Sequence, residues 1–167
     1  MSLLDRVRFL LLTGFGSGLA PFAPGTFGSV VGVAIGIGIE LGVPGSSPWI
    51  LWSISIVLLA YGCAESAFVE RAFPSKDPGA VVLDEIIGQL VAAALFVSVC
   101  GRPLGLVGWA LCFAEFRFFD IAKIQPAKRL EKIPGAPGIM LDDVAAGVWA
   151  GACVIALDLV GIVPLSE

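Results

Sequence analysis

The sequence predicts an all-α protein, a polytopic membrane helical bundle formed by a single domain over residues 1–167. The chain is 57% hydrophobic and only 14% charged, whereas soluble domains average about 45–50% and about 25%. Its mean hydropathy is +0.96. A soluble domain of this size leaves much of its surface in contact with water, so it could not hide so much apolar surface. A lipid bilayer can accept that surface.

Five apolar stretches approach the length of a transmembrane helix, which needs about 20 residues. They are residues 28–43, 49–64, 83–101, 104–119 and 144–164. Some of them are short, and the first and fourth carry the weakest signal, so we expect about five spans, with three or four as the alternatives. Glycine is frequent inside the stretches, which allows helices to approach one another closely in lipid.

The segment before the first stretch predicts an amphipathic helix that remains on the mature chain. It carries two arginines, as a signal peptide would, but Asp5 interrupts it. The apolar run from Phe9 to Leu12 is also too short for a signal peptide.

The basic residues predict the orientation of the chain, because Lys and Arg favour the cytoplasmic side of a membrane. With five spans, the N-terminus and the loops 65–82 and 120–143 face the cytoplasm. Of the 10 Lys and Arg residues, only Arg102 then lies on the outer side.

The absence of histidine limits the chemistry that the chain can perform. It excludes histidine-nucleophile phosphatases, Ser-His-Asp hydrolases and ordinary zinc hydrolases. The four cysteines lie singly inside apolar runs and form no CxxC metal motif, so we interpret them as small apolar side chains. The net charge of −4, with no basic stripe, argues against a nucleic-acid partner. Catalysis must therefore use carboxylates, hydroxyls, Lys, Arg or a hard metal ion.

Two pairs of adjacent carboxylates stand at the predicted starts of apolar helices. Asp84 and Glu85 open the third stretch, and Asp142 and Asp143 precede the fifth. Such groups are costly at a membrane unless their charge is neutralised. For Asp142 and Asp143, helix capping is the alternative interpretation, and it explains one aspartate better than two. Together the pairs offer hard oxygen ligands, which suit Mg²⁺.

Arg117, Asp120 and Lys123 are spaced at i, i+3 and i+6, so they lie on one face of a helix. Two interpretations fit this spacing equally well. The three residues form an ion-paired group at a helix end, with snorkelling cations, or the two cations hold a phosphate group.

The segment 16–29, GSGLAPFAPGTFGS, is the longest stretch rich in glycine and polar residues. Its backbone N–H groups could bind an anion ahead of a helix, with hydroxyls from Thr26 and Ser29. The simpler interpretation is a loop in which Thr26 or Ser29 caps the next helix. In the five-span arrangement, all of these polar segments fall at the cytoplasmic face, so we expect one active site there.

Taken together, the chain resembles the phosphatidylglycerophosphatase A family. The resemblance rests on four segments in the family's order and spacing, within residues 14–147, and they are 16–29, 77–89 (DPGAVVLDEIIGQ), 116–123 (FRFFDIAK) and 138–147 (GIMLDDVAAG). It implies a multi-pass enzyme of the bacterial cytoplasmic (inner) membrane, with its active site facing the cytoplasm. The implied reaction is Mg²⁺-dependent hydrolysis of phosphatidylglycerophosphate to phosphatidylglycerol and phosphate, in phospholipid biosynthesis.

The resemblance also implies roles for individual residues. The expected metal ligands are Asp84, Glu85, Asp142 and Asp143. The expected catalytic residues are Asp84, Asp120, Asp142 and Asp143. The expected substrate-binding residues are Thr26, Gly28, Ser29, Arg117 and Lys123.

Two positions depart from the family's pattern. Members often continue the lysine motif as Lys-Pro, whereas Ile124 follows Lys123 here, and many have a histidine where Lys76 precedes Asp77. Both positions flank the motifs, so the departures bear on loop shape and substrate preference rather than on the carboxylates.

Several alternatives stay open at this point. The chain could act on another phosphorylated lipid, or it could be an ion-coupled membrane transporter in which Glu40 and the acidic pairs line an ion path. The expected partners are a phosphorylated glycerophospholipid and the bilayer. Either an activated water or a carboxylate could be the nucleophile, and the number of metal ions and the oligomeric state are open.

Overall fold

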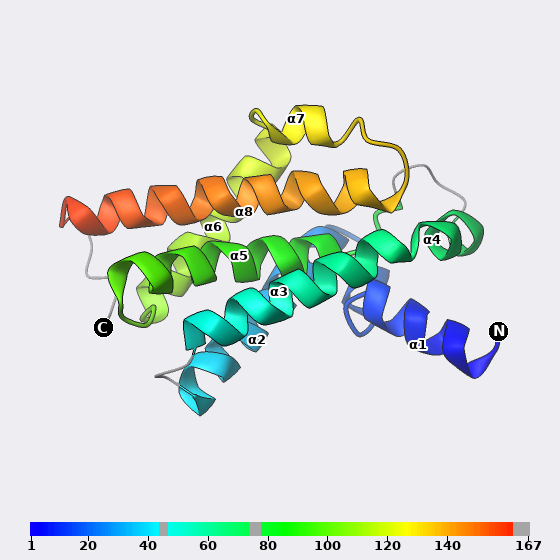
Figure 1. Ribbon diagram of the computed structural model, residues 1–167, viewed down its shortest axis with the longest axis horizontal. Coiled ribbons are helices and arrows are strands. Elements are labelled where there is room, and N and C mark those ends of the chain that lie inside the picture. The colour runs from blue at the N-terminus through cyan, green and yellow to red at the C-terminus, as the bar shows by residue number, and fades with distance from the viewer. Residues whose placement is uncertain (44–46, 74–77, 162–167) are drawn as a thin grey trace.

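Helices supply the secondary structure of the residues that the computed structural model describes, which are 1–43, 47–73 and 78–161 (Figure 1). Strands are absent from these residues. The sequence positions Lys76 and Asp77 lie outside them. The elements in chain order are α1 (Leu3–Leu12), the short 3₁₀ helix η1 (Ser17–Leu19), α2 (Pro24–Gly42), α3 (Ser47–Ala64), α4 (Ser66–Ala72), α5 (Leu83–Cys100), α6 (Leu106–Ala122), α7 (Ala127–Leu130) and α8 (Ala136–Leu159).

Within the described residues, four helices are long and apolar enough to cross a membrane, namely α2, α3, α5 and α8. The polytopic helical bundle is therefore confirmed, and four of the five expected stretches form helices with the length and hydropathy of a membrane span. The remaining stretch, 104–119, forms α6, which at 17 residues is one residue shorter than α3 and α5. Glu115 and Arg117 fall inside this stretch, which explains its weak apolar signal. The predicted N-terminal helix is present as α1, and a capping box between Ser2 and Asp5 fixes its start.

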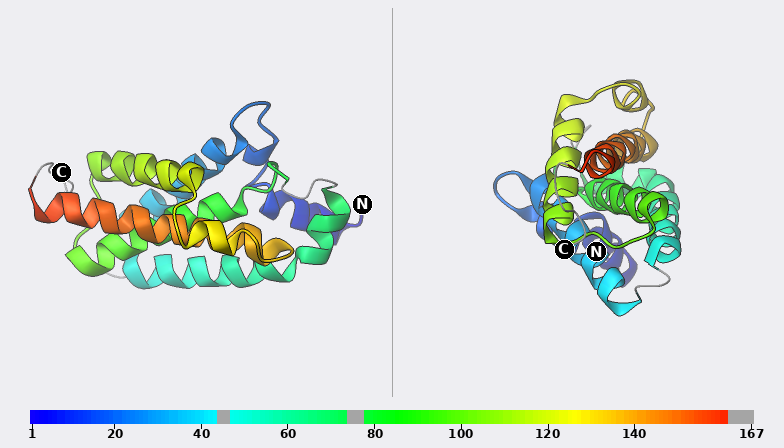
Figure 2. Two further views of the ribbon diagram at one scale, coloured as in Figure 1. Left: turned by 90° about the horizontal axis from the view of Figure 1, so that it is seen from above. Right: turned by 90° about the vertical axis from the view of Figure 1, so that its left-hand side faces the viewer.

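Helix α5 forms the centre of the bundle and packs against α2, α3, α6 and α8 (Figure 2). Most of its residues are buried, a larger share than in α2, α3 or α8, so other helices rather than lipid surround it. Helix α2 approaches through glycines. A Cβ atom at Gly32 would lie 2.9 Å from the Cβ of Gln89, and one at Gly36 would overlap the ring of Trp109.

The backbones of α5 and α8 approach each other closely. A Cβ atom added at Gly147 would overlap the carbonyl oxygen of Gly88, and one at Gly88 would lie 2.7 Å from the carbonyl oxygen of Asp143. One turn further on, a Cβ at Gly151 would lie 2.9 Å from the carbonyl oxygen of Ala92. Small residues at four-residue spacing are the common means of close helix packing in membranes.

Two helix starts differ from the sequence prediction. Helix α8 begins at Ala136 rather than near residue 144, so Asp142 and Asp143 lie inside the helix instead of at its head. Pro137 occupies the first turn, where the missing N–H of proline has no consequence.

Helix α2 also begins earlier than predicted, at Pro24. Thr26 and Ser29 are therefore inside it, and the prediction that either residue caps it is wrong. The hydroxyl of Ser29 donates instead to the carbonyl of Gly25, at 2.9 Å.

At the C-terminal end of α2, a buried carboxylate connects two parts of the bundle. Glu40, in the last turn of α2, accepts hydrogen bonds from the backbone N–H of Leu104 at 3.2 Å and from the indole of Trp109 at 2.9 Å. Both oxygens of this carboxylate therefore have partners, which satisfies its hydrogen-bonding requirement and links α2 to α6.

Replacing Gly147 by alanine is expected to destabilise the protein, because backbone atoms of α5 cannot move aside for the new Cβ. Overpacking of this kind costs about 1–3 kcal/mol. Gly38→Ala is the matched control, since a Cβ at that position meets no atom within 4 Å. Thermal unfolding of the detergent-purified variants, followed by circular dichroism, should give a lower midpoint for Gly147→Ala. Equal midpoints would contradict the close α5–α8 contact.

Candidate active site

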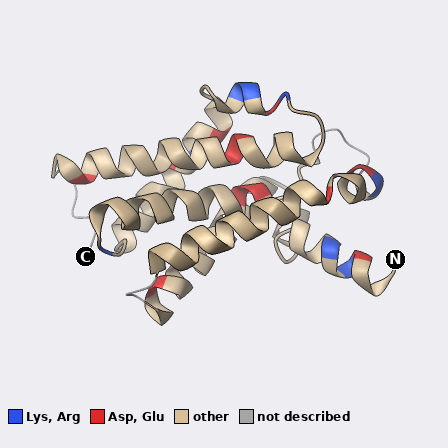
Figure 3. Cartoon of the chain, in the orientation of Figure 1, with Lys and Arg blue, Asp and Glu red and all other residues tan. Residues whose placement is uncertain are grey.

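Carboxylates from α5 and α8 converge at one place. Asp84, Glu85 and Asp143 each offer an oxygen atom, and these atoms all lie within 4.8 Å of one another. Asp84 stands four residues before Gly88, and Asp143 stands four residues before Gly147. The close approach of α5 and α8 at Gly88 and Gly147 therefore also brings together Asp84 and Asp143, which lie one helical turn before the glycines. Figure 3 shows the acidic segments of the two helices facing each other.

This three-carboxylate group, Asp84, Glu85 and Asp143, is largely buried, with Glu85 partly exposed, and is short of hydrogen-bond partners. Asp84 is 7% exposed and Asp143 is 4% exposed. Among the described residues, neither Asp84 Oδ1 nor Glu85 Oε2 has a hydrogen-bond partner. Charges of one sign in such a place are costly unless a counter-charge neutralises them. The donors are all oxygens, and the group therefore fits a hard divalent cation such as Mg²⁺.

Asp142, the fourth predicted ligand, has a different neighbour. Its Oδ2 forms an ion pair with Lys123 Nζ, and it is not part of the three-carboxylate group. Glu131 lies 3.8 Å from the same ammonium. Partial burial works to lower the pKa of Lys123, but the hydrogen bond and charge of Asp142 outweigh it, so the pKa is raised and Lys123 stays protonated.

Arg117 is also paired. Its Nη1 lies 2.7 Å from Asp120 Oδ2 and 3.5 Å from the hydroxyl of Ser29. Asp120 is in turn a near neighbour of both Asp143 and Glu85. The sequence left open whether these cations form ion pairs or hold phosphate. In the structure, Arg117 pairs with Asp120, while Lys123 pairs with Asp142, on α8.

The first turn of α2 packs directly on the carboxylates, through a residue that sequence reasoning did not select. A Cβ atom at Gly25 would overlap Glu85 Oε1 and lie 3.1 Å from Arg117 Nη1. Gly25 falls within the segment 16–29, but only the fold shows that its lack of a side chain leaves room for Glu85. Gly28, which the sequence did select, packs against Val82, where a Cβ would lie 2.6 Å from the Val82 Cβ.

A cavity of about 710 Å³ opens beside the carboxylates, within the size range of small-molecule sites. Of the predicted residues, Asp84, Glu85, Asp120, Lys123, Asp142 and Asp143 line it. The structure describes Thr26, Gly28, Ser29 and Arg117, but they do not line the cavity. Sequence reasoning missed Glu131 and Lys132, which reach the cavity from the loop between α7 and α8.

Comparison with known proteins bears on what this site does. The sequence model of the phosphatidylglycerophosphatase A family matches residues 10–158. The chain belongs to this family. It is 36% identical to phosphatidylglycerophosphatase A of Haemophilus influenzae over 159 residues, which cover 94% of this chain and 91% of the relative. It is 32% identical to phosphatidylglycerophosphatase A of Escherichia coli over 145 residues, covering 83% and 76%.

A third relative has a different name within the same class of chemistry. A protein of Bacteroides thetaiotaomicron, provisionally named a phosphatidylinositol-3-phosphatase, is 36% identical over 143 residues, which cover 84% of this chain and 87% of the relative. The search of solved structures gave no match. Membership of the phosphatidylglycerophosphatase A family confirms the resemblance on which the sequence interpretation rested.

The contact between Gly25 and Glu85 leads to a test of the expected Mg²⁺ site. A Gly25→Ala substitution should push the Glu85 carboxylate away from Asp84 and Asp143, because the new Cβ needs the position of Glu85 Oε1. We expect the Kd for Mg²⁺ to rise about tenfold to a hundredfold, as for other residues that support metal ligands. Gly42→Ala, at the end of the same helix, is the control because a Cβ there meets no atom within 4 Å. Isothermal titration should distinguish the two variants, and unchanged affinity in Gly25→Ala would contradict this role.

Proposed function

We propose that this chain hydrolyses the terminal phosphate monoester of phosphatidylglycerophosphate, releasing phosphatidylglycerol and inorganic phosphate. The observation that carries the proposal is the buried three-carboxylate group beside a cavity of about 710 Å³. Family membership supports the substrate, since two relatives bear the name of this activity. The chain would thus be a phosphoric monoester hydrolase.

Mg²⁺ is the cofactor that we propose, held by Asp84, Glu85 and Asp143. The unpartnered buried oxygens of Asp84 and Glu85 support this assignment. When bound, the ion would offset most of the charge of the three carboxylates, attract the phosphate and polarise its oxygens. Asp142 was also expected to be a ligand from the sequence. Its ion pair with Lys123 instead favours a role in positioning that lysine.

The remaining charged side chains have separate roles in the reaction. Lys123 lines the cavity, stays protonated and is held in place by Asp142, so its ammonium can donate hydrogen bonds to phosphate oxygens. Asp120 lines the cavity while Arg117 holds one of its oxygens. We assign Asp120 as the base that accepts the proton of an attacking water. Arg117 thus acts through Asp120 rather than on the substrate.

The arrangement also supports the expected orientation in the inner membrane. Basic residues of α1, α4 and α7 gather at the end of the bundle that holds the three-carboxylate group (Figure 3). By the preference of Lys and Arg for the cytoplasmic side, the cavity would face the cytoplasm. The lipid substrate would reach it from the inner leaflet.

A second candidate function has one specific observation in its favour. The Bacteroides thetaiotaomicron relative is named for a phosphorylated inositol lipid and is as similar as the Haemophilus influenzae protein. Another phosphorylated lipid is therefore the alternative substrate. The transporter hypothesis has less support, because Asp84 and Glu85 lie in the first turn of α5, not at its middle. The carboxylate of Glu40 is also fully engaged by Leu104 and Trp109.

The direct test is phosphate release from phosphatidylglycerophosphate by the detergent-purified protein. We expect release that stops when EDTA removes divalent cations and returns with Mg²⁺. Asp143→Asn should lower kcat at least about a hundredfold, because it removes a charged oxygen ligand. Asp158→Asn is the matched control on the same helix, since Asp158 pairs with Arg102 at the opposite end of the bundle.

The outcomes separate the substrate from the site. No release from this lipid by a folded, Mg²⁺-supplied protein would refute the substrate and leave the other phosphorylated lipids to be assayed. Release that persists in Asp143→Asn would keep the substrate and refute the proposed metal site.

A further inference from the structure

The cavity contains many more acidic than basic side chains. Beyond the three-carboxylate group it is lined by Asp120, Glu131 and Asp142, and the lining cations are Lys123 and Lys132. Lys123 is ion-paired with Asp142, lies near Glu131 and is assigned to the terminal phosphate. Lys132 is therefore the lining cation that has neither an ion pair among the described residues nor an assigned ligand.

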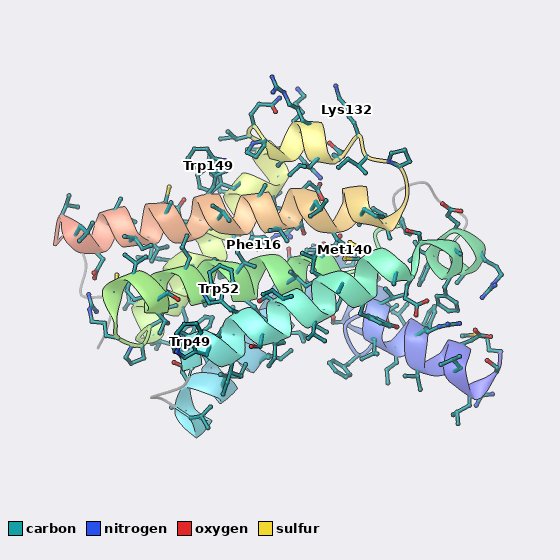
Figure 4. The ribbon with its side chains drawn as sticks, viewed as in Figure 1. Trp49, Trp52, Phe116, Lys132, Met140 and Trp149 are labelled. Carbon is teal, nitrogen blue, oxygen red and sulfur yellow. The ribbon has the colours of Figure 1, made fainter. Side chains whose placement is uncertain are left out.

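Lys132 has no acidic side chain within ion-pairing distance anywhere in the described part of the chain. It is exposed at the edge of the cavity, on the loop that follows α7. Its side chain points away from α8 in Figure 4. A lysine at such a rim is a mobile point charge that suits a phosphate oxygen.

The backbone that carries Lys132 is firmly placed. Its N–H donates to the carbonyl of Arg129 at 3.3 Å, and the N–H of Ile133 donates to the carbonyl of Leu130 at 2.9 Å. The carbonyl of Ile133 packs against Gly138 in the first turns of α8, where a Cβ would overlap it. The loop therefore holds the base of the lysine side chain at a fixed place relative to Asp142 and Asp143.

We propose that Lys132 binds the phosphodiester of the lipid substrate, the anionic group that joins the headgroup to diacylglycerol. This inference rests on the proposed function. The terminal monoester would lie against the three-carboxylate group and Lys123. The second phosphate, one glycerol unit away and nearer the lipid tails, would then lie towards the rim of the cavity, where Lys132 is the unpaired cation.

The proposed contact gives the site a basis for selecting its substrate. Phosphatidylglycerophosphate and phosphorylated phosphatidylinositol share this diester, although their headgroups differ. Phosphatidate lacks it, since its one phosphate is itself the monoester. Lys132 therefore favours lipids that carry a phosphorylated headgroup over lipids whose only phosphate is attached directly to diacylglycerol.

The test compares two short-chain substrates, dihexanoyl phosphatidylglycerophosphate and dihexanoyl phosphatidate, with Mg²⁺ present. Lys132→Gln should raise KM for the first about tenfold, the usual effect of losing a hydrogen bond to a charged group. We expect kcat to stay within about twofold, because the monoester keeps its own contacts. KM for phosphatidate should not change, and Lys132→Arg should restore most of the lost affinity. Lys128→Gln is the control, since Lys128 is exposed on α7 and does not line the cavity.

A binding measurement without turnover keeps this inference separate from the proposed function. Dihexanoyl phosphatidylglycerol retains the diester and has no terminal phosphate, and its Kd can be measured by isothermal titration. Lys132→Gln should weaken its binding about tenfold while Lys128→Gln leaves it unchanged. Equal effects of Lys132→Gln on both substrates, or unchanged phosphatidylglycerol binding, would overturn the inference. If the wild-type protein hydrolyses neither substrate, the proposed function fails and the phosphatidylglycerol measurement still decides the role of Lys132.

Discussion

The distance between the backbones of α5 and α8 sets the geometry of the whole site. Gly88 and Gly147 allow the two helices to touch, and this short distance between the helices brings the carboxylates one turn away close to one another. Electrostatic repulsion among Asp84, Glu85 and Asp143 opposes the contact, while close packing of the glycine faces and the burial of α5 favour it. The packing of the helices therefore sets the arrangement of oxygen atoms that a cation would meet.

The carboxylates of the site fall into two sets, those that are paired with a cation and those that are not. Arg117 and Lys123 each neutralise one aspartate, Asp120 and Asp142, and both of these face the cavity. The three-carboxylate group receives no such partner among the described residues. Proteins seldom bury unpaired charge without a functional reason. We therefore propose that the metal ion binds the three-carboxylate group and not Asp120 or Asp142, which already have cationic partners.

Much of this architecture could be predicted from the sequence, but the differences within each motif could not. Composition and the apolar stretches predict a membrane bundle, and the two acidic pairs predict one site. Adjacent residues on a helix point about 100° apart, so Asp142 and Asp143 face different neighbours. The partner of Asp142 is Lys123, which lies on another element and cannot be assigned by spacing. Gly25 and Lys132 were missed for the same reason, because their roles depend on contacts across the fold.

The start of α8 was misplaced because a proline–glycine segment is typical of a turn as well as of a first helical turn.

The position of the cavity beside membrane-crossing helices has a consequence for how the reaction would be measured. Its lining includes Ile121, Ile133 and Ile139 as well as the charged groups, so a lipid could place its headgroup among the carboxylates while its acyl chains stay in the bilayer. Encounters between enzyme and substrate would then occur by lateral diffusion in two dimensions. The rate would depend on the mole fraction of the lipid in the membrane, and adding inert lipid at constant total substrate would slow the enzyme by surface dilution.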